Sequence, residues 1–139
     1  DFDCAPALLQ AWLPRVACYM CFRVAVHAIE SWILADRERF AGFLDIGASQ
    51  IAANTDSLYC PKETIVSLAR QSRRREIRED MVPRPGSGRS VGPAYNARMV
   101  EFVDKEWRPE VAERSSSSLR SCRAALSRLL NSSSDPSRP

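Results

Sequence analysis

The sequence predicts an α/β domain with a mostly parallel sheet that ends in several helices. Residues 20–28 (MCFRVAVHA) alternate their side chains between two faces and are rich in β-branched and aromatic residues, as in a strand. Asp1, Phe2 and Asp3 stand where an upstream strand would end, and later segments repeat apolar residues at helical spacing. Because this order is typical of three-layer domains, we expect the C-terminal part of one, with further strands upstream.

The first half of the chain predicts two helices around that strand. Pro6 can open a short helix that stops at Pro14. A second helix is predicted over residues 30–44, with Ile29, Ile33, Phe40 and Leu44 near helical spacing and with residues 36–39 exposed. Gly47 marks its end, and residues 48–60 are expected to be irregular.

The second half predicts three more helices and one long loop. A helix begins at Pro61 and carries Ile65, Leu68 and Ala69 toward the core, and the charged stretch 70–80 that follows contributes little to the core. Prolines and glycines make a loop of residues 83–93. A helix is predicted over residues 93–107 with Tyr95, Met99, Phe102 and Val103 inward, and another from residues 115–118 onward. We expect one domain over residues 1–131 and a disordered tail over residues 132–139.

Composition favours a cytoplasmic protein. The chain has 139 residues, of which 45% are hydrophobic and 27% charged, and its five cysteines lack the dense spacing of a disulfide framework. The apolar stretch of residues 16–29 is too short for a membrane span and is interrupted by Arg23 and His27. We therefore expect no membrane partner.

Three acids are candidate metal ligands. Asp1 and Asp3 are two residues apart, so in extended backbone their carboxylates point the same way, and Glu30 follows the predicted second strand. If the two strands are neighbours, these oxygens could surround one Mg²⁺ ion. The alternatives are that Asp3 caps a helix, that Asp1 is a charged chain end, and that Glu30 favours a helix dipole.

The same residues carry a resemblance to a known family. Asp-Phe-Asp-Cys at the start, followed by Val-Ala-Val-His-Ala-Ile-Glu-Ser-Trp-Ile-Leu-Ala-Asp at residues 24–36, resembles an uncharacterised family of bacterial Toprim-like proteins. The resemblance covers residues 1–44, with a looser echo at residues 61–62 and 92–95. It implies that an Asp-x-Asp pair at the end of a strand binds magnesium and that the domain acts on phosphodiesters.

This resemblance implies roles for specific residues. Asp1 and Asp3 match the family's metal pair, and Glu30 matches its glutamate before a tryptophan, which makes Glu30 the candidate catalytic residue. The family's upstream glutamate is absent, so we expect a truncated chain that is inactive as it stands. Phage-defence nucleases are among the proteins with such domains, and ATPases are often encoded beside this family.

Arginines supply a second candidate site. Of twenty basic residues only two are lysines, and arginine binds phosphate well. Arg84 and Arg89 lie in the Gly/Pro loop with no acid between residues 81 and 98, so they are candidate phosphate-binding residues. The arginine run of residues 70–78 could contact nucleic acid too, but Glu76, Glu79 and Asp80 could instead pair with it on a solvated helix face.

Three functions are therefore in competition. The first is a magnesium-dependent, nuclease-like protein that processes phosphodiesters. The second is a noncatalytic subunit that docks on a partner ATPase through its last helix. The third is a nonspecific nucleic-acid binder, whose affinity should fall steeply with salt.

Overall fold

The computed structural model of this chain describes residues 5–13, 15, 20, 21, 23, 25 and 28–133. Contacts divide the chain into two compact units. The first unit comprises residues 1–24 and 120–139, and the second unit comprises residues 25–119. The predicted single domain over residues 1–131 stays a prediction, and the second unit contains the larger core and the candidate site.

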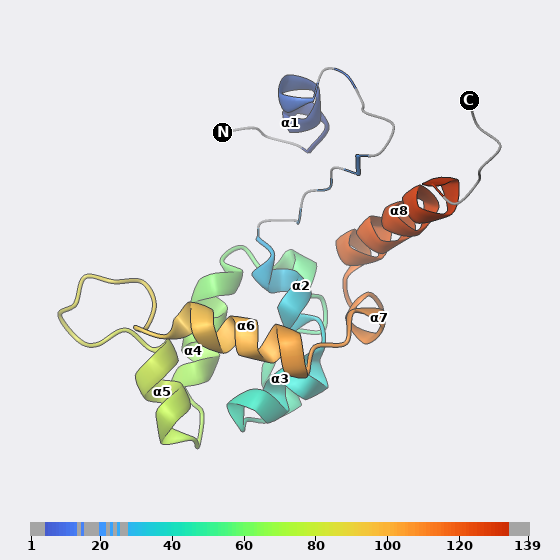
Figure 1. The fold of residues 1–139 in the computed structure, drawn as a ribbon. Coiled ribbons are helices and arrows are strands. Elements are labelled where there is room, and N and C mark those ends of the chain that lie inside the picture. Colours follow the sequence, from blue (N-terminus) through green and yellow to red (C-terminus); the bar gives the residue numbers. More distant parts are fainter. Residues whose placement is uncertain are drawn as a thin grey trace. The chain divides into compact units, whose positions relative to one another are not determined.

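The helices shown in Figure 1 follow in chain order. They are α1 (Ala5–Trp12), α2 (Glu30–Leu34), α3 (Arg37–Leu44), the 3-10 turns η1 (Ala48–Gln50) and η2 (Thr55–Ser57), α4 (Pro61–Arg70), α5 (Arg75–Met81), α6 (Tyr95–Lys105), α7 (Pro109–Ala112) and α8 (Ser117–Ser133). Within the described ranges no helix is long and apolar enough to cross a membrane.

The predicted α/β fold class with a parallel sheet is wrong. The described residues are helical or irregular, and none of them lies in a strand. In the predicted strand, Met20, Cys21, Arg23 and Ala25 have no regular structure, and the other residues up to position 27 lie outside the described residues. None of the described residues that follow lies in a strand, and a lone strand leaves its backbone groups without hydrogen-bond partners.

Helix packing builds the core of the second unit instead. The rings of Phe40 on α3 and Phe102 on α6 meet edge to face with centroids 4.9 Å apart, and Phe43 lies 5.3 Å from Phe102. Phe40 and Phe102 are fully buried. Burying a side chain of this size stabilises the fold by about 1.5–3 kcal/mol, so these rings join α3 to α6 across some sixty residues of sequence.

The structure confirms the predicted inward faces of two helices in this unit, α4 and α6. On α4, Ile65, Leu68 and Ala69 are buried, and Pro61 is at the first helical position. Along α6 the buried residues are Tyr95, Met99 and Phe102, and Val103 packs against the same core. Spacings of three and four residues therefore identified both faces.

The predicted helix over residues 30–44 is in fact two helices. It breaks at Asp36, whose backbone leaves the helical region with φ −83° and ψ 67°. The predicted exposure of Asp36 is also wrong, because its side chain is completely buried and accepts hydrogen bonds from Arg108 at 3.0 and 2.7 Å. Ile29, predicted on the inward face, is 60% exposed.

The charged stretch 70–80 also contributes more to the core than predicted. Its second half belongs to α5, in which Ile77 and the next residue after the stretch, Met81, are completely buried. These two apolar residues are four positions apart, so they share one face of a single short helix while the charged residues occupy the other. The helix thus presents its arginines from a fixed, packed position.

Candidate nucleic-acid interface

The loop between α5 and α6 is closed at its base by backbone hydrogen bonds. The amides of Gly92 and Ala94 donate to the carbonyls of Met81 and Asp80, both at 2.9 Å. This approach is so close that a Cβ on Gly92 would lie 2.3 Å from the Asp80 carbonyl oxygen. Only glycine allows it, so the two ends of the loop are held together.

A surface depression of about 660 Å³ lies between this loop, α5 and the end of α4. It is lined by Arg70, Arg75, Arg78, Glu79, Asp80, Val82, Pro83, Arg84, Pro85 and Pro93. Four guanidinium groups thus face two carboxylates. The excess of positive charge suits an anionic ligand.

A second, smaller depression of about 360 Å³ adjoins the first. It is lined by Arg84, Ser87, Arg89, Val91 and Pro93, so it shares Arg84 and Pro93 with the larger one. Arg84 and Arg89 are both exposed. The structure therefore brings the two loop arginines predicted to bind phosphate together in one depression, with Arg84 bordering both.

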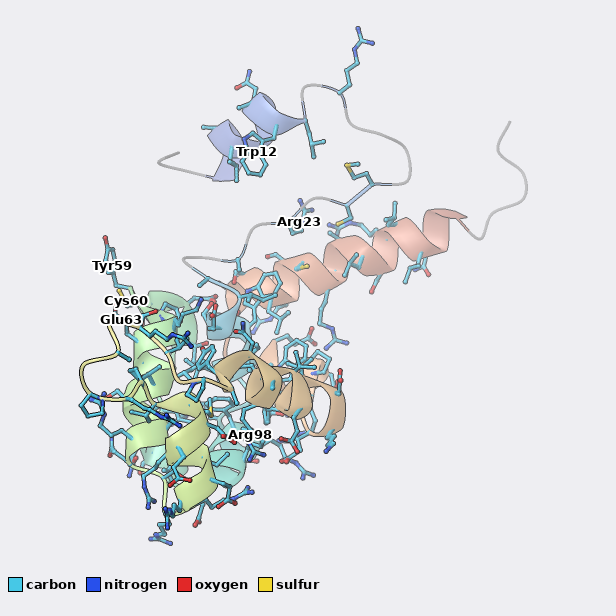
Figure 2. All side chains as sticks on the ribbon, turned by 60° about the vertical axis from the view of Figure 1, so that its left-hand side comes forward. Trp12, Arg23, Tyr59, Cys60, Glu63 and Arg98 are labelled. Atoms are coloured by element: carbon cyan, nitrogen blue, oxygen red, sulfur yellow. The ribbon has the colours of Figure 1, made fainter. Side chains whose placement is uncertain are left out.

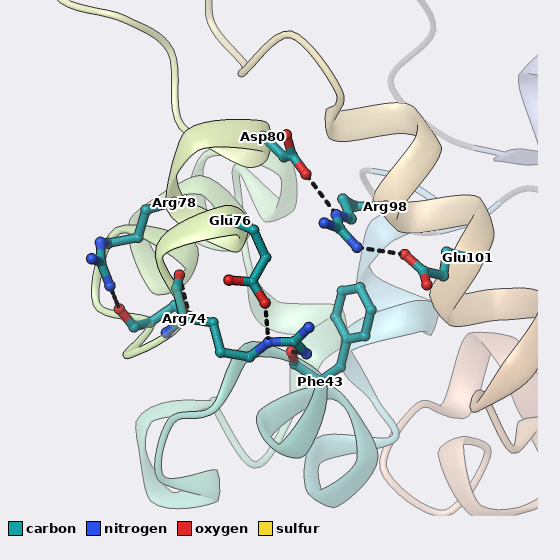
Figure 3. A network of polar contacts seen from close by, with 8 residues as sticks. Phe43, Arg74, Glu76, Arg78, Asp80, Arg98 and Glu101 are labelled. Carbon is teal, nitrogen blue, oxygen red and sulfur yellow. Dashed lines mark hydrogen bonds and ion pairs between the residues drawn. The ribbon is translucent and has the colours of Figure 1, made fainter.

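Neighbouring arginines already hold the two carboxylates of the larger depression. Arg75 pairs with Glu79 at 2.7 Å, and this hydrogen bond raises the pKa of Arg75. Asp80 accepts from Arg98 at 2.8 Å, and Arg98 also donates to Glu101 at 2.8 Å (Figure 3). Hydrogen bonds to Glu101 and then to Asp80 raise the pKa of Arg98. Both acids are thus neutralised locally.

The remaining arginines of the two depressions keep their charge for a ligand. Among the described residues, no carboxylate lies within ion-pair distance of Arg70, Arg84 or Arg89. Arg78 donates to the carbonyl oxygen of Ser72, which carries no negative charge that would pair with the guanidinium group. Contact with an anion would therefore not require these groups to break a salt bridge.

Sequence reasoning left open whether the helix arginines belong to this site. Arg70 ends α4, whereas Arg75 and Arg78 are three positions apart on α5, which places them on one face. That spacing was the available signal, but it did not show that the face adjoins the Gly/Pro loop. The predicted intrahelical pairs exist for Arg75 with Glu79, while Arg74 binds Glu76 at 2.9 Å and the Phe43 carbonyl at 3.3 Å (Figure 3).

The predicted metal site stays a prediction. Asp1 and Asp3 lie outside the described residues, and Glu30 is the first residue of α2, where its side chain is 12% exposed and lies 3.4 Å from Lys62. The premise that Glu30 follows a strand is not met among the described residues around it. In the part of the chain that the structure describes, no three histidine, cysteine or acidic side chains could hold one ion together.

Comparison with protein-family models, with curated proteins and with solved structures found no match for this chain. The resemblance to Toprim-like proteins therefore stays a prediction.

Proposed function

We propose that this chain binds nucleic acid independently of base sequence, through arginines that contact backbone phosphates. The observation that supports this most strongly is the pair of adjoining depressions lined by Arg70, Arg75, Arg78, Arg84 and Arg89. Phosphate contacts of this kind position a protein on nucleic acid but do not read base sequence.

The distribution of charge along the chain supports the same proposal. Residues 70–98 contain eight arginines and three acids, so this segment carries more positive charge than the net +3 of the whole chain. The rest of the sequence is therefore slightly acidic. A localised positive surface on such a chain attracts polyanions to one place.

The arrangement of the two depressions favours a ligand with several phosphates. Arg84 borders both, while Arg70 and Arg89 each border only one. A single phosphate cannot occupy both depressions, whereas successive phosphates of a nucleic-acid strand can. Arg84 should then contribute the most to binding.

Substitution of Arg84 tests this proposal. Arg84→Ala should weaken the binding of a short fluorescent DNA duplex by roughly three- to tenfold near physiological salt, because one phosphate contact is lost. Fluorescence anisotropy measures the affinity. The matched control is Arg39→Ala, because Arg39 is an exposed arginine of α3 that lines neither depression. Equal affinities of the two variants would contradict the proposal.

The magnesium-dependent processing of phosphodiesters stays a second proposal. It requires Asp1, Asp3 and Glu30 to hold Mg²⁺. It predicts that a form of the protein that carries the family's upstream glutamate cleaves or nicks nucleic acid in Mg²⁺ or Mn²⁺, and that Asp3→Asn abolishes this activity while the fold is kept. The partner ATPase likewise stays a prediction. The magnesium-dependent activity can be separated from the proposed binding function, because Glu30 lines neither arginine depression.

A further inference from the structure

The uncharged part of the two depressions consists of proline, valine and serine side chains. These residues are Val82, Pro83, Pro85, Ser87, Val91 and Pro93. Among the described residues, no aromatic side chain lines either depression. Proteins that hold single-stranded nucleic acid rely on aromatic rings on which successive bases stack. The site therefore has cations for phosphates but no aromatic platform for bases.

The aromatic residues of the second unit are used elsewhere. Phe40, Phe43, Phe102 and Tyr95 are buried in the core. Trp32 donates its indole N–H to the Ser118 hydroxyl at 2.7 Å. Trp32 and Trp107 are both partly buried and pack against a small core cluster that includes Ala35 and Ala112. None of these rings is available to a base at the depressions.

The one strongly exposed ring among the described residues of this unit is Tyr59, which is 83% exposed. It lies just before α4, near Cys60 and Glu63 in Figure 2, whereas Arg70 is the last residue of that helix. Ten helical residues rise about 15 Å, so the backbone of Tyr59 is about that far along the α4 axis from the backbone of Arg70. It is therefore too far away to stack a base beside Arg70.

Resting on the proposed function, we infer that the arginine depressions bind duplex nucleic acid in preference to single strands. A duplex presents one phosphate charge per about 1.7 Å of its axis, and a single strand about half that density. A site that makes only phosphate contacts gains from the higher density. It gains nothing from the exposed bases that a single strand offers.

The rigid base of the loop also favours a duplex. Hydrogen bonds from Gly92 and Ala94 to the end of α5 fix the distance between the loop and the helix, and the prolines restrict the backbone near those ends. Such a site suits the regular spacing of phosphates along a stiff duplex. A flexible strand would lose conformational freedom in order to match it.

The test compares duplex and single-stranded ligands of the same length, labelled with the same dye, on the full chain. We expect a DNA or RNA duplex to bind about tenfold more tightly than either of its separated strands, with a ratio that is the same for two unrelated sequences. The DNA and RNA arms show which duplex is preferred. Tyr59→Ala should leave the affinity for single strands unchanged.

The outcomes separate this inference from the proposed function. Equal or tighter binding of single strands, still weakened by Arg84→Ala, would overturn the duplex preference and leave the arginine site in place. A loss of single-strand affinity in Tyr59→Ala would show that a base stacks on that ring and would also overturn it. No binding of any nucleic acid at low salt would overturn both.

Discussion

Asp36 is the residue on which the junction between α2 and α3 depends. Its carboxylate accepts three hydrogen bonds from Arg108, including one from the backbone amide at 3.0 Å. Hydrogen bonding to Asp36 raises the pKa of Arg108. A buried carboxylate is tolerated only when its oxygens are paired in this way, so a residue 72 positions away determines where the helix breaks.

Removing that carboxylate should destabilise the chain. We expect Asp36→Ala to lower the free energy of unfolding by about 2–3 kcal/mol, because the backbone amide of Arg108 loses its acceptor and a small cavity forms. Urea denaturation followed by circular dichroism measures this. In the control, Glu38→Ala, an 84% exposed side chain 3.8 Å from Arg108 is removed, and a change of about 0.5 kcal/mol or less is expected. Equal effects would contradict the assigned role of Asp36.

Gly92 is a second single residue on which the structure depends, because it holds the base of the loop close to α5. Because an added Cβ would meet the backbone of Asp80, Met81 and Val82 within 2.7 Å, Gly92→Ala should force the loop away from α5. We expect a loss of about 1–3 kcal/mol in unfolding free energy, together with weaker nucleic-acid binding. Thermal unfolding and anisotropy measure the two effects.

The matched control is the exposed Gly42 within α3, where an added Cβ would have no neighbour within 4 Å. Gly42→Ala should stabilise the chain by up to about 1 kcal/mol, since alanine favours a helix interior. A Gly92→Ala variant as stable as this control would contradict the close approach of loop and helix.

Among the helices, α8 begins at a cluster of hydrogen bonds to Asp56. The Ser118 amide donates to Asp56 at 3.0 Å, and the hydroxyls of Ser116 and Ser118 donate at 2.8 and 2.9 Å. Burial acts to raise the pKa of Asp56, but these hydrogen bonds and one from Ser117 outweigh it and lower the pKa below its usual value. The start of α8 is thus tied to η2 by an ionised carboxylate.

This arrangement predicts a pH dependence. A carboxylate with a lowered pKa in the folded chain stabilises the fold above its unfolded pKa of about 3.9, and the contribution is lost as the pH falls through the folded value. We expect unfolding midpoints measured from about pH 5 to about pH 3 to fall less steeply for Asp56→Asn than for the unmodified chain. Asp104→Asn, at an exposed position of α6, is the control and should leave the slope unchanged. Parallel curves for Asp56→Asn would contradict the prediction.

Elements with a strong local pattern were predictable from the sequence, whereas elements that depend on distant partners were not. Spacing identified the inward residues of α4 and α6, and the Gly/Pro content identified the loop with Arg84 and Arg89. Residues 20–28 have the composition of a strand, but this local pattern could not show that none of the described residues that follow forms a partner strand. The break at Asp36 depends on Arg108, which a local pattern cannot reveal.

At the scale of the whole molecule, the proposed binding function depends on the uneven distribution of charge along the chain. Outside residues 70–98 the sequence is slightly acidic, whereas arginines concentrate on α5, on the end of α4 and in one loop, where two acids already have partners. Sequence reasoning identified the loop arginines because no acid stands near them in the chain. It left open whether Arg70, Arg75 and Arg78 belong to the same site, since only tertiary packing places two helices beside that loop.

The salt dependence of binding tests this central claim most directly. The logarithm of the affinity for duplex DNA should fall linearly with the logarithm of salt concentration, and each lost phosphate contact should reduce that slope by about 0.9. The variant with Arg70, Arg84 and Arg89 all changed to alanine should therefore have a slope smaller by roughly two to three. A slope equal to that of the unmodified chain would contradict the account, because binding would then depend on other residues.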